Sequence, residues 1–155
     1  MNFGKALQQD KIRNLSTRQA VTAAPSETYQ SVVNRLRAAR SGCAIIVQDK
    51  KVVGILTERD ILTRGVLARA PSHTPIEQLM TANPKLLDME DSVAVAIRLM
   101  HEGKYRHLPI VNAERELLGL VSVRDIVAYL AENYPYEVYN LPPDPHQVIA
   151  SPEGA

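Results

Sequence analysis

The sequence predicts an α+β protein built from two tandem copies of one β-α-β-β-α unit. The octapeptide Gly-Ile-Leu-Thr-Glu-Arg-Asp-Ile at 54–61 returns at 119–126 as Gly-Leu-Val-Ser-Val-Arg-Asp-Ile. The same alternation of short apolar runs and helical periodicity precedes each octapeptide. With 155 residues, 45% of them apolar, the chain is long enough for one ordinary domain or two small ones. The repeat favours two half-size copies.

A short strand and an amphipathic helix open each copy. We expect the strands over residues 20–23 and 84–88. Thr28 and Asp91, which follow them, are residues of the N-cap type. Behind these residues, apolar side chains recur with helical spacing at 29, 32, 33 and 36 and at 93, 96, 97 and 100. The pattern therefore predicts two helices that begin after Thr28 and Asp91.

Two further strands and a closing helix complete each copy. Apolar and β-branched residues fill 44–47 and 108–111, as is typical of short buried strands. Polar turns follow at 48–51 and 112–116, and apolar runs return at 52–56 and 117–121. We expect the closing helices to start at Glu58 and Val123.

Composition assigns the rest of the chain. The copies are expected at 20–68 and 80–132, joined by a linker at 69–79 and preceded by an N-terminal segment at 1–19 with a short helix. Prolines at 135, 142, 143, 145 and 152 predict an extended or irregular tail over 133–155. Tyr134, Tyr136 and Tyr139 either anchor that tail on a partner subunit or lie in a mobile tail.

Charge and composition exclude several classes of protein. The chain has 18 basic and 17 acidic side chains, so it lacks the concentrated basic face that nucleic acids and anionic membranes attract. No Trp and one Phe leave little aromatic surface for stacking unpaired bases. A signal-peptide core and a membrane span are missing from the sequence, and the single Cys43 cannot form an internal disulfide. We therefore expect a cytoplasmic protein that binds neither nucleic acid nor membrane.

The repeated motif, Gly, two apolar residues, Ser or Thr, any residue, Arg and Asp, has two interpretations. Thr57 and Ser122, each followed three residues later by Asp, resemble a capping box that only satisfies backbone N–H groups. A helix N-terminus also attracts phosphate, and the hydroxyl adds a donor. Asp60 and Asp125, one turn later, can accept two hydrogen bonds from a ribose diol.

The doubled unit resembles a tandem pair of CBS domains, the regulatory modules named after cystathionine β-synthase. The resemblance covers about residues 20–130 and includes Met-Thr-Ala-Asn-Pro at 80–84 and Tyr-Arg-His-Leu-Pro-Ile-Val at 105–111. The tail at 138–145 resembles a C-terminal extension of stand-alone bacterial members. The resemblance implies two repeats related by a pseudo-twofold axis, with two clefts between them.

The resemblance also implies that the clefts bind an adenosine ligand such as AMP, ADP, ATP or S-adenosylmethionine. By motif match, the hydroxyls of Thr57 and Ser122 would contact phosphate, and the carboxylates of Asp60 and Asp125 would hold the ribose. The arginines within the motifs are candidate phosphate partners, and adenine would lie against the opening segment of each copy. These further candidates are Arg59, Arg124, Thr22, Ala23, Lys85 and Leu86.

The two copies differ in charge beside their second strands. Arg106 and His107 precede that strand in the second copy, where the first copy has Gly42 and Cys43. If these residues border a cleft, the two clefts carry unequal positive charge. We hypothesise that a nucleotide binds at one favoured site, and more weakly or not at all at the other, with Arg106 and His107 among the ligand-binding residues.

The sequence offers no catalytic or metal-binding constellation. No triad or nucleophile elbow surrounds Cys43, and the four histidines are not paired at zinc spacing. We therefore expect no enzyme, no metal and no cofactor, but a sensor that binds an adenosine ligand and acts on a separate effector protein. By resemblance it would be a homodimer. The alternative is a structural dimerisation or interaction module whose motifs only cap helices and whose clefts stay empty.

Overall fold

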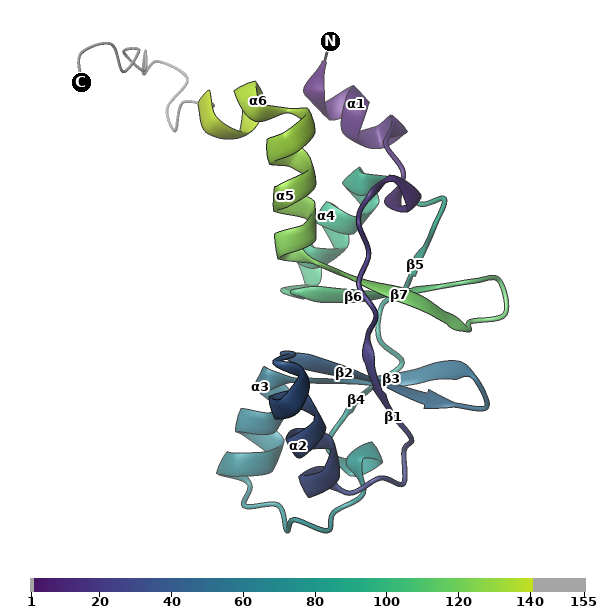
Figure 1. The fold of residues 1–155 in the computed structure, drawn as a ribbon, viewed down its shortest axis with the longest axis vertical. Helices are drawn as coiled ribbons and strands as arrows, with labels where there is room; N and C mark the ends of the chain where they lie inside the picture. Colours follow the sequence, from purple (N-terminus) through teal and green to yellow (C-terminus); the bar gives the residue numbers. More distant parts are fainter. Residues whose placement is uncertain (1, 141–155) are drawn as a thin grey trace, which may run out of the picture.

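The structure, a computed structural model that describes residues 2–140, confirms the α+β class. Two small sheets face each other in the middle of the molecule, and helices cover the outer side of each sheet (Figure 1). We call the sheet of β1 to β4 with its helices the first copy, and the sheet of β5 to β7 with its helices the second copy.

The first copy contains a four-stranded sheet in the order β1-β2-β3-β4. β1 lies parallel to β2, and the other neighbours are antiparallel. Helix α3 passes directly into a π-helical segment, η2. The elements are β1 (Val21–Ala23), α2 (Tyr29–Ala39), β2 (Cys43–Gln48), β3 (Lys51–Thr57), α3 (Glu58–Asp60), η2 (Ile61–Leu67), η3 (Ile76–Gln78) and β4 (Thr81–Ala82).

The second copy repeats this arrangement with a three-stranded sheet in the order β5-β6-β7. β5 is parallel to β6, and β6 is antiparallel to β7. The elements are β5 (Leu87–Asp88), α4 (Val93–Gly103), β6 (His107–Val111), β7 (Leu117–Ser122) and α5 (Val123–Asn133). The opening strand predicted over 84–88 is thus confined to its last two residues, because β4 takes the preceding chain to the other sheet.

The first helix of each copy begins at a hydroxyl N-cap. Thr28 accepts a hydrogen bond from the Ser31 N–H at 3.2 Å, and Ser92 accepts one from the Val95 N–H at 3.2 Å. The prediction that Asp91 is the second N-cap is wrong by one residue. The Asp91 carboxylate instead accepts the Asp88 N–H at 2.8 Å, which stabilises the turn before the cap.

Three apolar clusters form the core of the protein. One lies between α2 and the first sheet, and one between α4, α5 and the second sheet. The third, which we call the seam, lies between the two sheets and contains Cys43, Ile45, Val52, Ile55, Val111 and Leu120. Since both sheets contribute to the seam, the two copies share an apolar interface.

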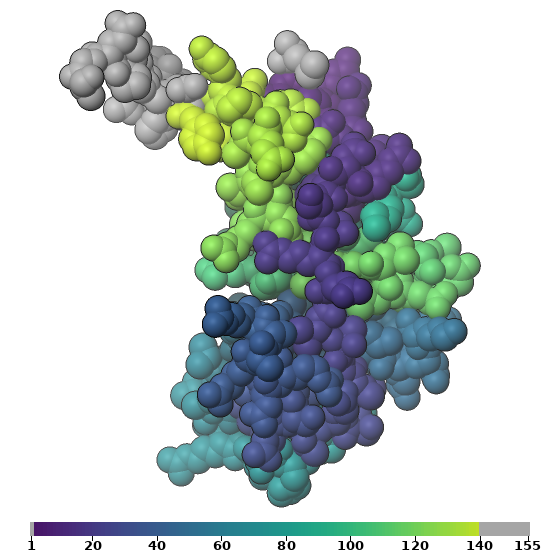
Figure 2. All heavy atoms as spheres, viewed as in Figure 1, coloured from purple at the N-terminus to yellow at the C-terminus, as the bar shows by residue number. Residues whose placement is uncertain are grey.

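The N-terminal segment packs on the second copy before it enters the first. It contains α1 (Phe3–Gln9) and the short η1 (Ile12–Asn14), so the short helix expected there is confirmed. Ile12 and Leu15 are buried in the core of the second copy, and the Ile12 N–H donates to the Asp91 carbonyl at 2.9 Å. Figure 2 shows this segment, in purple, lying across the second copy and reaching the first.

Two stretches of chain therefore pass from one copy to the other, and we call them the crossing segments. Residues 16–20 lead from the core of the second copy into β1, and Arg18 pairs with Leu120 of β7 on the way. Residues 80–86 lead from the core of the first copy to β5, and β4 within them pairs with β3. Each crossing segment thus lies against the strand that leads into the motif of the copy that the segment is leaving. Residues 16–20 lie against β7, and residues 80–86 lie against β3.

The described part of the tail is helical. α6 (Pro135–Asn140) follows α5, so the prediction of an irregular tail is wrong at these residues. A proline at the first helical position fits, because its missing N–H has no partner there anyway. The Tyr134 hydroxyl donates to Asp10 at 2.5 Å and its ring packs on Phe3, so this side chain ties the end of α5 to the N-terminal segment of the same chain. The prolines at 142, 143, 145 and 152 lie outside the described residues.

Candidate functional site

The first motif forms a capping box at the start of α3. The Asp60 N–H donates to Thr57 Oγ1 at 3.3 Å. In return, the N–H and the hydroxyl of Thr57 donate to Asp60 Oδ2 at 2.9 and 3.0 Å. Asp60 is buried, so its carboxylate is held in one place by its own strand and helix.

The second motif repeats this geometry at the start of α5. The Asp125 N–H donates to Ser122 Oγ at 3.2 Å, and the N–H and hydroxyl of Ser122 donate to Asp125 Oδ2 at 2.8 and 2.9 Å. The capping interpretation is therefore confirmed in both copies. The assignment of ribose and phosphate to these same groups remains a prediction.

The other oxygen of each motif carboxylate faces a crossing segment. Asp60 Oδ1 accepts the Thr81 hydroxyl at 3.0 Å. Asp125 Oδ1 accepts the Nε–H of Arg18 at 2.9 Å and forms an ion pair with Arg18 Nη2, also at 2.9 Å. The sequence analysis missed Thr81 and Arg18 as site residues, because neither belongs to a repeated motif and only the crossing of the chain brings them there.

The glycine of each motif lies beneath a crossing segment. A Cβ added to Gly54 would collide with the side chain of Met80, and one added to Gly119 would lie 3.4 Å from the carbonyl oxygen of Arg18. A side chain at Gly54 would therefore displace the Met80 side chain, which packs over β3 at this place. Because the glycine that opens each motif has no side chain, the crossing segment can pack closely against the strand.

Charged groups of both motifs act on His107 at the start of β6. His107 is half-buried, and burial, as the largest cause, holds the pKa of its imidazole below the usual value. The carboxylates of Glu58 and Asp125, from different copies, oppose that shift, whereas Arg18 and Arg106 add to it. His107 thus senses charges of both motifs, and Arg106 beside it is exposed.

Cys43 occupies the position in the first copy that His107 has in the second. The thiol is fully buried, and burial, assisted by the charge of Glu58, raises its pKa to about 12. A thiol with that pKa is protonated at neutral pH and is a poor nucleophile. Its surroundings indicate a packing role in the seam.

The remaining predicted site residues lie on the helices and opening segments. Arg59 and Arg124 are exposed in the first turns of α3 and α5. In the first opening segment, Ala23 is buried, and the carbonyl of Thr22 accepts Nη1 of Arg35 at 2.6 Å. In the second, Lys85 is exposed and Leu86 packs against the seam.

The strand pairing shows which residues of the two opening segments correspond. Ala23 pairs with Ile46 of β2, and Leu87 pairs with Ile110 of β6 at the same level. Leu86 and Leu87, rather than Lys85 and Leu86, are therefore the counterparts of Thr22 and Ala23.

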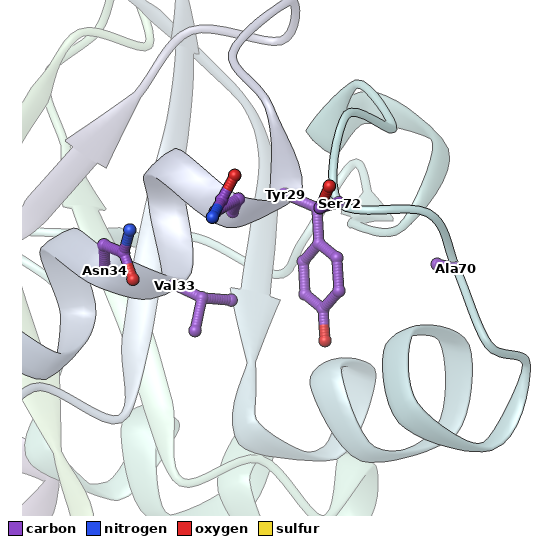
Figure 3. Close-up of a pocket in the computed structure, with 6 residues that line it drawn as sticks. Tyr29, Val33, Asn34, Ala70 and Ser72 are labelled. Atoms are coloured by element: carbon purple, nitrogen blue, oxygen red, sulfur yellow. The ribbon is translucent and has the colours of Figure 1, made fainter.

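The structure also contains a shallow depression far from both motifs. It lies between α2 and the chain after η2, and none of the predicted ligand residues lines it (Figure 3). Its lining residues are Tyr29, Gln30, Val33, Asn34, Ala70 and Ser72. The residues that carry the motif chemistry are instead the fixed carboxylates, hydroxyls and arginines at the two helix starts.

Two features are absent from residues 2–140. Within that range, no three His, Cys, Asp or Glu side chains gather as a metal site would require. None of the helices there has the length and apolarity needed to cross a membrane.

Comparison with known proteins agrees with the doubled fold. Residues 12–66 and 76–132 match the family profile described as CBS domain. The CBS domain-containing protein CBSCBSPB1 of Arabidopsis thaliana is 35% identical over 100 residues, which are 64% of this chain and 18% of that protein. The matched region thus spans about a fifth of the length of this curated relative.

Solved structures extend the likeness to three dimensions. A CBS domain protein from Pyrobaculum aerophilum complexed with AMP is 30% identical, with a TM-score of 0.70 over 79% of this chain and 98% of that one. A second CBS domain structure, NE2398, is 27% identical, with a TM-score of 0.67 over 72% of this chain and 87% of that one. Both similar structures match more than two thirds of the chain.

Proposed function

Because the chain belongs to the CBS domain family, we propose that it is a regulatory module that binds an adenosine-containing ligand beside its two motifs. The observation that carries the proposal is the matched pair of carboxylates, Asp60 and Asp125, each fixed at a helix start beside a hydroxyl. A carboxylate so placed can accept hydrogen bonds from a ribose diol, while the N–H groups of the helix start and the hydroxyl can donate to phosphate. The AMP complex of the similar Pyrobaculum aerophilum protein supports this ligand class.

Within that class we propose AMP, ADP, ATP or S-adenosylmethionine as the ligand. The residues proposed to hold it are the hydroxyls, arginines and aspartates of the motifs, and Arg106 and His107 at the start of β6. The opening segments would lie against the adenine. The proposed residues are Thr57, Arg59, Asp60, Ser122, Arg124, Asp125, Arg106, His107, Thr22, Ala23, Lys85 and Leu86. We propose no cofactor in addition to this ligand.

The proposed role is regulatory and not catalytic. Cys43 has a protonated, buried thiol, and the motif aspartates are engaged as caps. Ligand binding would act by favouring one arrangement of the copies over another. The change would be read by a separate effector protein in the cytoplasm.

A homodimer is the proposed assembly. Large apolar side chains on the closing helices are exposed in the single chain, namely Leu62, Val66 and Leu67 of η2 and Val127 of α5. Such side chains on corresponding helices of both copies would be covered by a second copy of the chain. Light scattering coupled to size exclusion tests this, since Val127→Asp should convert a dimer to a monomer.

The second candidate function is a dimerisation module that binds no ligand. The observation in its favour is that both oxygens of Asp60 and of Asp125 already accept hydrogen bonds within the protein. Capping and crossing contacts alone could account for the repeated motif. The two candidates therefore differ in what happens when an adenosine compound is added.

A thermal-shift panel separates the two functions. AMP, ADP, ATP, S-adenosylmethionine and GTP are each added to the folded full chain. A ligand at about 100 times its Kd should stabilise the protein by roughly 2.7 kcal/mol. Stabilisation by an adenosine compound, reduced in Asp60→Ala or Asp125→Ala, supports ligand binding. No shift with any of the five compounds contradicts it and favours the dimerisation module.

A further inference from the structure

The two motif carboxylates differ in the partner of their second oxygen. Asp60 Oδ1 accepts a neutral hydroxyl, that of Thr81, at 3.0 Å. Asp125 Oδ1 faces a guanidinium, that of Arg18, which donates from Nε at 2.9 Å and forms an ion pair through Nη2 at 2.9 Å. Both partners come from crossing segments, so the same place in the fold is neutral in the first copy and cationic in the second.

The geometry allows Arg18 to leave Asp125 while the carboxylate stays. The Arg18 side chain is 58% exposed, whereas that of Asp125 is 9% exposed and is fixed by Ser122. An exposed arginine gives up a single ion pair readily because water solvates its charge. Two ribose hydroxyls could then donate to the oxygen that Nε and Nη2 occupy.

A released Arg18 would remain close to the place of a phosphate. Arg18 and the Ser122 hydroxyl contact the two oxygens of the same carboxylate. A phosphate held by that hydroxyl and the start of α5 would therefore lie within reach of the guanidinium. Arginine pairs with phosphate through parallel, charge-assisted hydrogen bonds.

Neighbouring charges strengthen the contrast between the copies. The motif residue after the hydroxyl is Glu58 in the first copy and Val123 in the second. The Arg106 carbonyl accepts the Val123 N–H at 3.0 Å, and Gly42 holds the equivalent place beside Glu58. The first copy thus has a carboxylate, Glu58, at the place of Val123, and the second copy has an arginine, Arg106, at the place of Gly42.

We propose that Arg18 makes the site of the second copy selective for phosphate-bearing adenosine ligands. The ribose hydroxyls take the place of Arg18 on Asp125, and the freed guanidinium pairs with the phosphate. Adenosine without phosphate breaks the same ion pair but gives Arg18 no new partner. The inference rests on the proposed function and assigns a specificity-determining residue to one of its two sites.

The test compares AMP with adenosine by isothermal titration. The full chain carries Asp60→Ala, which removes the ribose acceptor of the first copy, and either Arg18, Arg18→Gln or Arg18→Lys. With Arg18, AMP should bind at least tenfold more tightly than adenosine. Arg18→Gln should reduce that ratio to about threefold or less through weaker AMP binding, and Arg18→Lys should retain most of it.

Arg13→Gln is the matched control, because Arg13 pairs with Glu90 at 2.8 Å on the same N-terminal segment and away from the motif. It should leave the AMP to adenosine ratio unchanged, and circular dichroism reports whether each variant is folded. An Arg18→Gln variant that binds AMP and adenosine in the original ratio overturns the role of Arg18 alone. A folded wild-type chain that binds neither compound overturns the proposed function as well.

Discussion

The Thr81 hydroxyl donates a hydrogen bond of 3.0 Å to the Asp60 carboxylate. Thr81 lies on the chain that leads into the second copy, whereas Asp60 begins the closing helix of the first. The contact therefore ties the connection between the copies to the motif carboxylate. Arg18 makes the corresponding tie to Asp125 from the other crossing segment.

The close approach of the crossing segment to Gly54 predicts a steric effect. Gly54→Ala places a methyl group against the side chain of Met80, and such overpacking lowers the free energy of unfolding by about 1–3 kcal/mol. Gly119→Ala is the matched control, because its Cβ would make only an ordinary contact at 3.4 Å. Urea denaturation should show that Gly119→Ala lowers the free energy of unfolding clearly less than Gly54→Ala does.

Shortening Met80 should relieve the effect at Gly54. In the Met80→Ala background, Gly54→Ala should cost markedly less than in the wild type, because the colliding atoms are gone. A double-mutant cycle of the two residues measures the coupling. Equal costs in both backgrounds would contradict the account of the motif glycine.

The capping role of Thr57 predicts a loss of stability without any ligand. Thr57→Val keeps the shape of the side chain but removes the hydroxyl that accepts the Asp60 N–H, which should cost about 1 kcal/mol in urea denaturation. Thr57→Ser retains the hydroxyl and should stay near the wild type. Equal stability of the Val and Ser variants would show that the cap contributes nothing.

The contact between the two ends of the described chain predicts local fraying. Tyr134→Phe removes only the hydroxyl that donates to Asp10, which should cost about 1 kcal/mol. Amide exchange should then accelerate in α1, Phe3–Gln9, more than in α2. Tyr136→Phe, at a side chain that is 78% exposed, is the control and should leave exchange in α1 unaltered.

His107 predicts a stability change on mild acidification. Its folded-state pKa lies below the usual 6.5, chiefly because of burial, so the unfolded chain takes up the proton at higher pH than the folded chain. The contribution is fully present above about pH 6.5 and is lost as the pH falls toward the folded-state pKa.

Urea titrations between pH 7 and pH 5 check this contribution. His107→Gln does not take up the proton, so its free energy of unfolding should fall less over that interval than that of the wild type. Parallel curves for the two proteins would contradict the burial of a neutral imidazole at the seam.

Local features of the fold follow from the sequence because they depend on nearby residues. Thr57 and Asp60 are three residues apart and form the capping box that this spacing predicts. Helical periodicity likewise identifies α2 and α4, and the short apolar runs identify β2 and β6.

The residue-by-residue correspondence between the two copies is harder to predict from the sequence. Ser92 corresponds to Thr28 and His107 to Cys43, each 64 residues apart, whereas Ser122 corresponds to Thr57 at 65. The extra residue belongs to the longer turn between β6 and β7. The motif offset of 65 therefore does not hold before that turn, where the strand pairing gives 64 and the prediction of Asp91 as the second N-cap assumed 63.

The crossing segments could not be predicted from local patterns. Arg18 and Asp125 are 107 residues apart in the chain, and neither periodicity nor motif spacing links them. Burial of Ile12 in the core of the second copy is what carries the N-terminal segment to that place. Arg106 and His107 predict a charge difference between the copies. The structure adds a second difference, because Asp125 pairs with Arg18 whereas Asp60 accepts a hydrogen bond from the neutral Thr81.

Isothermal titration of AMP into the full chain, with Asp60→Ala/Asp125→Ala as the comparison, tests the central claim most directly. The account predicts saturable binding to the wild type and a loss of at least tenfold in affinity in the double variant, which circular dichroism should show to be folded. Equal AMP affinity of the two proteins would contradict the assignment of the motif carboxylates to ligand binding.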